Sequence, residues 1–283
     1  MRKIYTKQDK TNQKFTTPEV VDYGMILFTD LIAQHEELLS YMVMPRYGQN
    51  LEAFFEKQNC CISNASILEI ARGTLSMLEG VHAAGYSYND LKLDNIMVGF
   101  NNRLSKEYTP ENVFAGASLH LVDFGFATSF VDKKTGLHIS QEEVETFRGN
   151  MIFGSLNQLN FLKTSRRDDL ISLLYMTIYM LNQGKLTGID LDTHMVNTEA
   201  FKLARKAKQN HTLDDLCCDN AQIMKKFANE VLNLKFKEQP DYKKLDKILQ
   251  EAFSEATDPC GTNSSSVGMS DDEPMDEDYK NSI

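Results

Sequence analysis

The chain has 283 residues, of which 42% are hydrophobic and 25% charged, and its formal net charge is −10. This composition is typical of a globular protein and excludes a wholly disordered chain. Six acidic residues lie within the last thirteen positions. Because nucleic-acid-binding proteins usually carry an excess of positive charge, nucleic acid is a poor candidate partner.

The five cysteines form two adjacent pairs and one single residue. This spacing predicts neither a disulfide framework nor a zinc site. We find no cleavable leader and no apolar run long enough to span a bilayer, so we expect no membrane partner. A reducing cytoplasmic or nuclear compartment is the expected location.

Residues 1–17 are rich in Lys, Gln, Asn and Thr and are predicted to be a polar segment that is either flexible or at the edge of a sheet. Two short apolar runs follow, Val20 to Gly24 and Leu38 to Met44, and predict two strands of a small sheet. The chain ends in an acidic stretch, 258–283, which contains three consecutive serines and is predicted to be disordered.

Between these parts the apolar residues recur mainly at helical spacing. A short helix is predicted around Leu51 to Phe55, and a longer one from Ile67 to Val81. The run from Leu170 to Leu181 is apolar on almost every side, which is typical of a buried central helix. Strand-like runs are predicted at Asn95 to Val98 and Leu119 to Val122, and Leu245 to Phe253 gives the last amphipathic helix.

Two motifs in the middle of the chain carry chemistry. Residues 88–95 have the sequence YNDLKLDN, and residues 123–125 have the sequence DFG. Together they resemble the catalytic loop and the metal-binding loop of eukaryotic protein kinases. The resemblance implies that Asp90 takes the proton of the acceptor hydroxyl and that Lys92 faces the γ-phosphate. It also implies that Asn95 and Asp123 bind Mg²⁺.

A second block narrows the resemblance. Residues 147–157, FRGNMIFGSLN, and 165–170, SRRDDL, resemble the casein kinase 1 pattern in which G-T-A-R-Y-A-S-I-N replaces the usual A-P-E and S-R-R-D-D-L opens the central helix. By the same resemblance, Asp169 accepts hydrogen bonds from the backbone of the catalytic loop. His82 is on the apolar face of its helix, so we expect a core histidine rather than a ligand.

The resemblance implies an α+β, protein kinase-like fold over residues 18–257. Residues 18–47 would be the remnant of a β-rich N-lobe and the hinge, and 48–257 the helical C-lobe. Residues 42–48 resemble the casein kinase 1 hinge, with Met44 as gatekeeper and the Pro45 carbonyl and Tyr47 N–H facing adenine. The implied cofactors are ATP and Mg²⁺, and the implied partner is a protein.

The chain departs from the kinase pattern at several positions. Gly24 is the only glycine before Gly48, so the glycine-rich loop is absent, and no lysine follows an apolar strand. Tyr88 and Asn89 replace the usual histidine and arginine. Asn150 replaces a threonine, and Ile152 replaces an anion-binding arginine. We therefore expect weak Mg-ATP binding and doubt that phosphorylated substrates are recognised.

Two interpretations of function remain open. The first is a casein kinase 1-like Ser/Thr kinase, inactive or weakly active as it stands because the gene model or fragment lacks its N-lobe. The second is a pseudokinase scaffold that binds a protein partner. The intact Asp90, Lys92, Asn95 and Asp123 favour the first, and the missing lobe favours the second.

Overall fold

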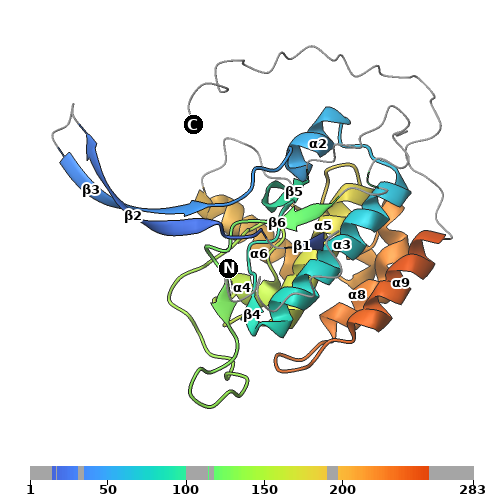
Figure 1. Cartoon of the computed structure of the whole chain (residues 1–283). Helices are drawn as coiled ribbons and strands as arrows, with labels where there is room; N and C mark the ends of the chain where they lie inside the picture. The colour runs from blue at the N-terminus through green and yellow to red at the C-terminus, as the bar shows by residue number, and fades with distance from the viewer. Residues whose placement is uncertain are drawn as a thin grey trace, which may run out of the picture.

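The computed structural model describes residues 15–16, 18–30, 35–99, 114, 118–189 and 197–254. The predicted acidic tail, 258–283, lies outside the described residues. So does most of the predicted flexible segment, 1–17. Figure 1 shows a body of packed helices with small sheets beside it and one long hairpin that leaves the body.

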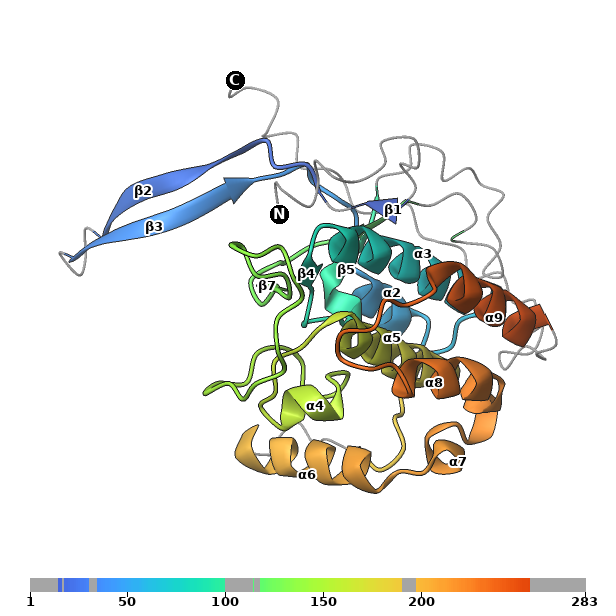
Figure 2. The same ribbon diagram turned by 90° about the horizontal axis from the view of Figure 1, so that it is seen from below.

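The helices are α2 (Leu51–Lys57), α3 (Asn64–Ala83), α4 (Leu156–Leu159), α5 (Arg166–Leu181), α6 (Asn197–Asn210), α7 (Leu213–Leu216), α8 (Lys225–Leu232) and α9 (Tyr242–Ser254), with 3₁₀ turns η1 (Leu93–Asn95) and η2 (Asp219–Met224). The predicted helices are confirmed as α2, α3, α5 and α9. Both α3 and α8 pack against α5, and α9 packs against α3 and α8 (Figure 2).

Helix α5 is the centre of the body, and its sequence explains why. Ser165 and Asp168 form a capping box at its N-terminus, which satisfies backbone N–H groups that would otherwise lack partners. Every residue from Asp168 to Ile178 is buried. A helix buried on all sides must be apolar on all sides, which is what the run from Leu170 to Leu181 shows.

A three-stranded sheet lies beside α3, with the order β1-β6-β5. Strand β5 (Ile96–Val98) is antiparallel to β6 (Leu119–Leu121), as the two predicted strand runs suggest. Strand β1 (Phe15–Thr16) is parallel to β6. Residues 15–16 are thus an edge strand, because the open edge of β6 supplies hydrogen-bond partners that the sequence does not reveal. Strands β4 (Tyr86–Ser87) and β7 (Thr128–Ser129) form a second, two-stranded pairing.

The two predicted N-terminal strands form a separate antiparallel hairpin, β2 (Asp22–Asp30) and β3 (His35–Val43), in a continuous register from Asp22↔Val43 to Asp30↔His35. Figures 1 and 2 both show it projecting away from the helices. Large apolar side chains are exposed along both strands, among them Tyr23, Met25, Ile26, Leu27, Phe28, Leu38, Tyr41, Met42 and Val43. The hairpin thus adds little to the core, and the fold is α+β with few strands.

Two further expectations can be compared with the described residues. No helix among them is both long and apolar enough to cross a bilayer. Cys61 takes part in a disulfide bond, which its spacing did not predict. Among the other described cysteines, Cys60, Cys217 and Cys218 are free.

Candidate active site

The residue predicted to be the base, Asp90, is held by its own loop. Strand β4 leads into this loop, and the 3₁₀ turn η1 closes it, which brings Asn95 back to Asp90. The Asn95 Nδ2 group donates to the Asp90 carbonyl at 2.9 Å and to Asp90 Oδ2 at 3.0 Å. Lys92 Nζ lies 3.7 Å from the same oxygen. The structure therefore places Lys92 and Asn95 beside the Asp90 carboxylate.

Burial controls the ionisation of Asp90, which is only 4% exposed. Loss of solvent raises the pKa of this carboxyl above its ordinary value, and the negative charge of Asp123 adds to the increase. The Lys92 ammonium and the Asn95 amide act in the opposite direction. A carboxylate with a raised pKa is a better proton acceptor, so the environment suits a general base.

Asp123 is exposed and lies close to this loop. Tyr88 connects the two segments, because its hydroxyl donates to the Val122 carbonyl at 2.6 Å. Its ring also meets the Phe124 ring edge-on, with 5.2 Å between centroids. In addition, the Val122 N–H donates to the Asn95 carbonyl at 2.9 Å. These contacts bring the predicted metal-binding residues Asn95 and Asp123 to one side of the site.

The donor atoms of Asn95 and Asp123 suit Mg²⁺, which prefers oxygen ligands. The Asn95 Nδ2 group is committed to Asp90, so the amide oxygen is the atom left for a cation. One Asp123 oxygen, Oδ1, accepts from the Gly125 N–H at 3.0 Å. Asp123 has a φ of 52°, a left-handed conformation that this local hydrogen bond supports. The ligand role of both residues stays a prediction.

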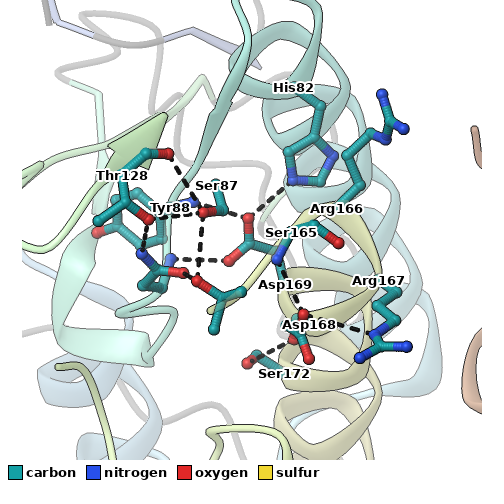
Figure 3. A network of polar contacts seen from close by, with 12 residues as sticks. His82, Ser87, Tyr88, Thr128, Ser165, Arg166, Arg167, Asp168, Asp169 and Ser172 are labelled. Atoms are coloured by element: carbon teal, nitrogen blue, oxygen red, sulfur yellow. Dashed lines mark hydrogen bonds and ion pairs between the residues drawn. The ribbon is translucent and has the colours of Figure 1, made fainter. Parts of the chain in front are cut away.

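Asp169, at the start of α5, holds the catalytic loop through its carboxylate, which lies between the loop and the helix (Figure 3). Its carboxylate accepts from the Tyr88 N–H and the Asn89 N–H, each at 2.7 Å. This is the geometry that the family resemblance implies. His82 Nε2 lies 2.8 Å from Asp169 Oδ2, and His82 Nδ1 lies 2.7 Å from the Tyr242 hydroxyl. His82 is thus a buried core histidine with two partners, as predicted.

Asn89 joins four parts of the chain, a role that the sequence did not reveal. Its side-chain amide donates to the Phe126 carbonyl at 2.8 Å and to Thr128 Oγ1 at 2.9 Å. Its side-chain oxygen accepts from Thr164 Oγ1 at 2.6 Å. Its backbone carbonyl accepts from Gln158 Nε2 at 2.8 Å. Asn89 has a φ of 73°, a conformation that asparagine tolerates better than most residues.

The predicted nucleotide residues Met44, Pro45 and Tyr47 follow β3, where the hairpin joins the body. The Gly48 N–H donates to the Val98 carbonyl of β5 at 2.8 Å. The Tyr47 ring stacks on His120 of β6 with 4.2 Å between centroids. Burial lowers the pKa of His120 to about 4, so this ring is neutral near pH 7. The segment therefore lies beside the β5–β6 sheet that carries Asn95, but its contact with adenine remains a prediction.

The loop before α4 departs from the family at Asn150 and Ile152. The Asn150 side-chain oxygen accepts from the backbone N–H groups of Ile152 and Phe153, both at 2.8 Å. The Asn150 side chain thus bonds its own loop and makes no hydrogen bond to the catalytic residues in the described structure. The Ile152 side chain is apolar and has no hydrogen-bonding atoms.

A cleft of about 540 Å³ lies on the Asn89 side of this loop, and its lining includes Glu143, Glu145, Arg148 and Lys163.

The sequence does not reveal the roles of four residues of the site. Tyr242 and Gln158 lie far from the motif in the chain, and no local pattern predicts their contacts. Tyr88 and Asn89 are marked in the sequence only as replacements for the usual histidine and arginine. The sequence signal that could have indicated a role for Tyr88 and Asn89 is their position directly before Asp90. The backbone N–H groups at these two positions donate to the Asp169 carboxylate.

Comparison with known proteins identifies the family of this chain. The protein kinase domain model matches residues 10–253. A probable casein kinase I homolog from Encephalitozoon cuniculi (strain GB-M1) is 26% identical over 238 residues, which are 83% of this chain and 66% of that protein. The match thus spans just under two thirds of the length of this relative. The chain belongs to the protein kinase family and is casein kinase 1-like within it.

Proposed function

We propose that this chain catalyses phosphoryl transfer from Mg-ATP to serine or threonine hydroxyls of proteins, with Asp90 as the base. One observation carries the proposal. The buried Asp90 carboxylate has Lys92 and Asn95 around it, and the Tyr88 contacts bring Asp123 to the same side. Phosphoryl transfer needs positioning and charge neutralisation more than covalent catalysis, and this set supplies both.

Each of these residues would have a distinct task. Asp90 accepts a hydrogen bond from the acceptor hydroxyl and takes its proton as the bond from that oxygen to the γ-phosphorus forms. The bond between the γ-phosphorus and the bridging oxygen breaks, and ADP leaves. The Lys92 ammonium offsets the negative charge of the transferred group. The Asn95 and Asp123 oxygens hold Mg²⁺, which neutralises charge on the phosphates when it is bound. Asp169 keeps the loop in place by fixing the Tyr88 and Asn89 N–H groups.

We expect slow transfer and weak nucleotide binding for this polypeptide. Gly24 is the only glycine before Gly48, and it lies within β2 against the Tyr41 ring rather than in a loop. The sequence before the hinge therefore contains no glycine-rich phosphate loop. The contact between a strand lysine and the phosphates, worth about 4 kcal/mol at a protein surface, corresponds to roughly a thousandfold in rate.

The β2–β3 hairpin favours a second candidate function, a pseudokinase scaffold that binds a protein partner. Its two strands expose apolar side chains over their length, for example Met25 at 60% and Leu38 at 57%. Exposed apolar patches of this kind commonly mark interaction surfaces. In this alternative the residues of the candidate active site are present, but the chain does not transfer phosphate.

The test is transfer of phosphate from Mg-ATP to dephosphorylated casein by the purified chain and by two variants. Asp90→Asn removes the base, and we expect a loss of about a hundredfold or more. Asp94→Asn is the matched control, because Asp94 is exposed in the same loop. We expect it to change the rate less than about twofold.

The outcomes separate the two candidates. Equal rates for the chain and Asp90→Asn would refute the assignment of the base. No transfer above the Asp90→Asn background at any Mg-ATP concentration would favour the scaffold.

A further inference from the structure

Lys208 is an unusual residue in the helical body. It lies in the last turn of α6, yet it is only 6% exposed, whereas its neighbours Lys206 and Gln209 are exposed. In the described part of the chain no carboxylate lies within ion-pair distance of its ammonium. Lysine is rarely buried unless its charge has partners, so the partners of Lys208 indicate what it does.

Its partners are backbone carbonyls of one loop. Lys208 Nζ donates to the carbonyls of Met151 at 3.1 Å, Ile152 at 2.6 Å and Gly154 at 2.5 Å. An ammonium has three N–H donors, and here each has its own acceptor. The Nζ atom also lies 4.5 Å from the centre of the Tyr175 ring, a cation–π contact with the central helix α5.

Burial lowers the pKa of Lys208 well below its ordinary value, so the charged form is disfavoured by loss of solvent. The contacts act in the other direction. A neutral amine would have only two N–H groups for three carbonyls, and its attraction to the Tyr175 ring would be weaker. The geometry is therefore matched to the ammonium, and removing its donors would leave buried carbonyls without partners.

The same loop is attached on its other side to the catalytic loop. Gln158 donates from Nε2 to the Asn89 carbonyl at 2.8 Å and also to the Arg148 carbonyl. Gly149 packs so closely that an added Cβ would lie 2.2 Å from the Asn89 carbonyl oxygen. The segment from Arg148 to Gly154 is thus held between Asn89, directly before the base, and Lys208 on α6.

Arg148, at the start of this segment, and Gln158, which follows it in α4, are part of the lining of the cleft beside Asn89. Asn89, the residue directly before Asp90, belongs to the same cleft wall. A polypeptide whose hydroxyl reaches Asp90 would have to pass this wall. A shift of the loop would therefore change how the polypeptide is seated, while Asn95 and Asp123 would stay where they are.

We propose that Lys208 is a positioning residue that fixes the backbone of Met151 to Gly154 and, through it, the flanking cleft-wall residues Arg148 and Gln158. In this way Lys208 sets the affinity for protein substrate and not for nucleotide. The inference rests on the proposed kinase function. The hydrogen bonds of Lys208 go only to backbone carbonyls, so they do not depend on which side chains occupy positions 151 and 152.

The main experiment replaces Lys208 by Met, which keeps most of the apolar stem and removes all three donors. Lys206→Met is the matched control, because it makes the same change at an exposed position of the same helix. For Lys208→Met we expect KM for dephosphorylated casein to rise about tenfold, with KM for ATP and kcat within about twofold. The control should leave all three constants within about twofold.

Amide hydrogen exchange on the same proteins tests the anchor without any need for activity. We expect exchange at residues 150–154 to be about tenfold faster in Lys208→Met, with no change in α5. Should Lys208→Met fail to fold, Lys208→Arg takes its place. The planar guanidinium keeps the charge but does not match three carbonyls, so we expect the same direction at about threefold.

The results distinguish this inference from the proposed function. A kinase whose kcat and KM for ATP change as much as its KM for casein, or whose exchange rises uniformly, would show a general structural role and overturn the inference. Unchanged exchange at 150–154 would also overturn it, even in an inactive chain. A chain with faster exchange at 150–154 that neither phosphorylates nor binds casein would refute the proposed function and the cleft role with it.

Discussion

The helical body and the β2–β3 hairpin are built on opposite principles. In the body, the polar side chains that hold the site are buried and partnered. Asp169 and His82 are 0% and 4% exposed, Asp169 bonds the catalytic loop, and His82 bonds Asp169 and Tyr242. In the hairpin, apolar side chains are exposed, and Leu27 is 57% and Tyr23 61% accessible. The hairpin is held mainly by its backbone ladder, whereas the body has both a packed core and an internal polar network. Function and stability should therefore respond to changes in the body and not to similar changes in the hairpin.

The largest effect is expected at Asp169. The change Asp169→Ala leaves the Tyr88 and Asn89 N–H groups without their acceptor and takes a partner from His82. Each buried polar group left unpaired costs about 1–3 kcal/mol, so we expect a loss of at least about 3 kcal/mol in the free energy of unfolding by urea. Asp246→Ala is the control, because Asp246 pairs with Arg72 at the surface, where both are about one third exposed. It should cost less than about 1 kcal/mol. Similar losses in both variants would contradict the role given to the buried network.

The same substitution in the two regions tests the comparison directly. Leu174 in α5 is 0% exposed and Leu27 in β2 is 57% exposed. We expect Leu174→Ala to lower the free energy of unfolding by about 2–5 kcal/mol, because it opens a cavity in the core. Leu27→Ala should change it by less than about 0.5 kcal/mol. A large effect of Leu27→Ala in the isolated chain would mean that the hairpin is packed in solution.

A smaller effect is expected at Tyr242, which connects α9 to the site through His82. Tyr242→Phe keeps the ring and removes only the hydroxyl that contacts His82 Nδ1. Leaving this buried nitrogen without its partner should cost about 1–3 kcal/mol. Thermal or urea unfolding measures this cost. Tyr41→Phe in the hairpin, where the hydroxyl bonds the exposed Asp22, is the control and should have almost no effect. An unchanged stability of Tyr242→Phe would place the hydroxyl outside the network.

The pH dependence of activity should show the smallest change. Only ionised Asp90 can take a proton, so activity falls as the pH drops through its raised pKa. Lys92 lowers the pKa of Asp90, so Lys92→Met should move the acid limb of kcat/KM toward higher pH. Lys247→Met, at an exposed lysine of α9 paired with Glu251, serves as control and should leave the limb in place. An acid limb that does not move would argue against Asp90 as the titrating base.

The pH dependence of stability at Asp90 has the opposite sign to the pH dependence of activity. The raised pKa means that the folded state prefers the protonated carboxyl, so its contribution to stability is lost as pH rises through that pKa. Asp90→Asn cannot ionise and should be at least as stable as the natural chain near pH 7. Urea unfolding at pH 5 and pH 8 would check this, and a clear destabilisation at pH 8 would contradict it.

Much of the architecture follows from sequence pattern. Helical periodicity located α2, α3, α5 and α9, because each has a stripe or a whole surface of apolar residues that must be buried. The alternation of apolar runs with polar turns located β2, β3, β5 and β6. The motif around Asp90 and the DFG sequence identified the candidate site, since that chemistry needs particular side chains in a fixed order.

The tertiary structure alone decided which distant residues meet. Phe15 and Thr16 pair with β6 because an open strand edge is there, and nothing in their polar surroundings predicts it. Tyr242 reaches His82 across 160 positions of sequence, and Lys208 reaches the loop before α4 across more than fifty. Such contacts depend on how helices pack against one another, and packing selects partners by shape and by unsatisfied hydrogen-bonding groups. The sequence determined the elements and the chemistry of the site, and the fold decided which buried groups hold that site in place.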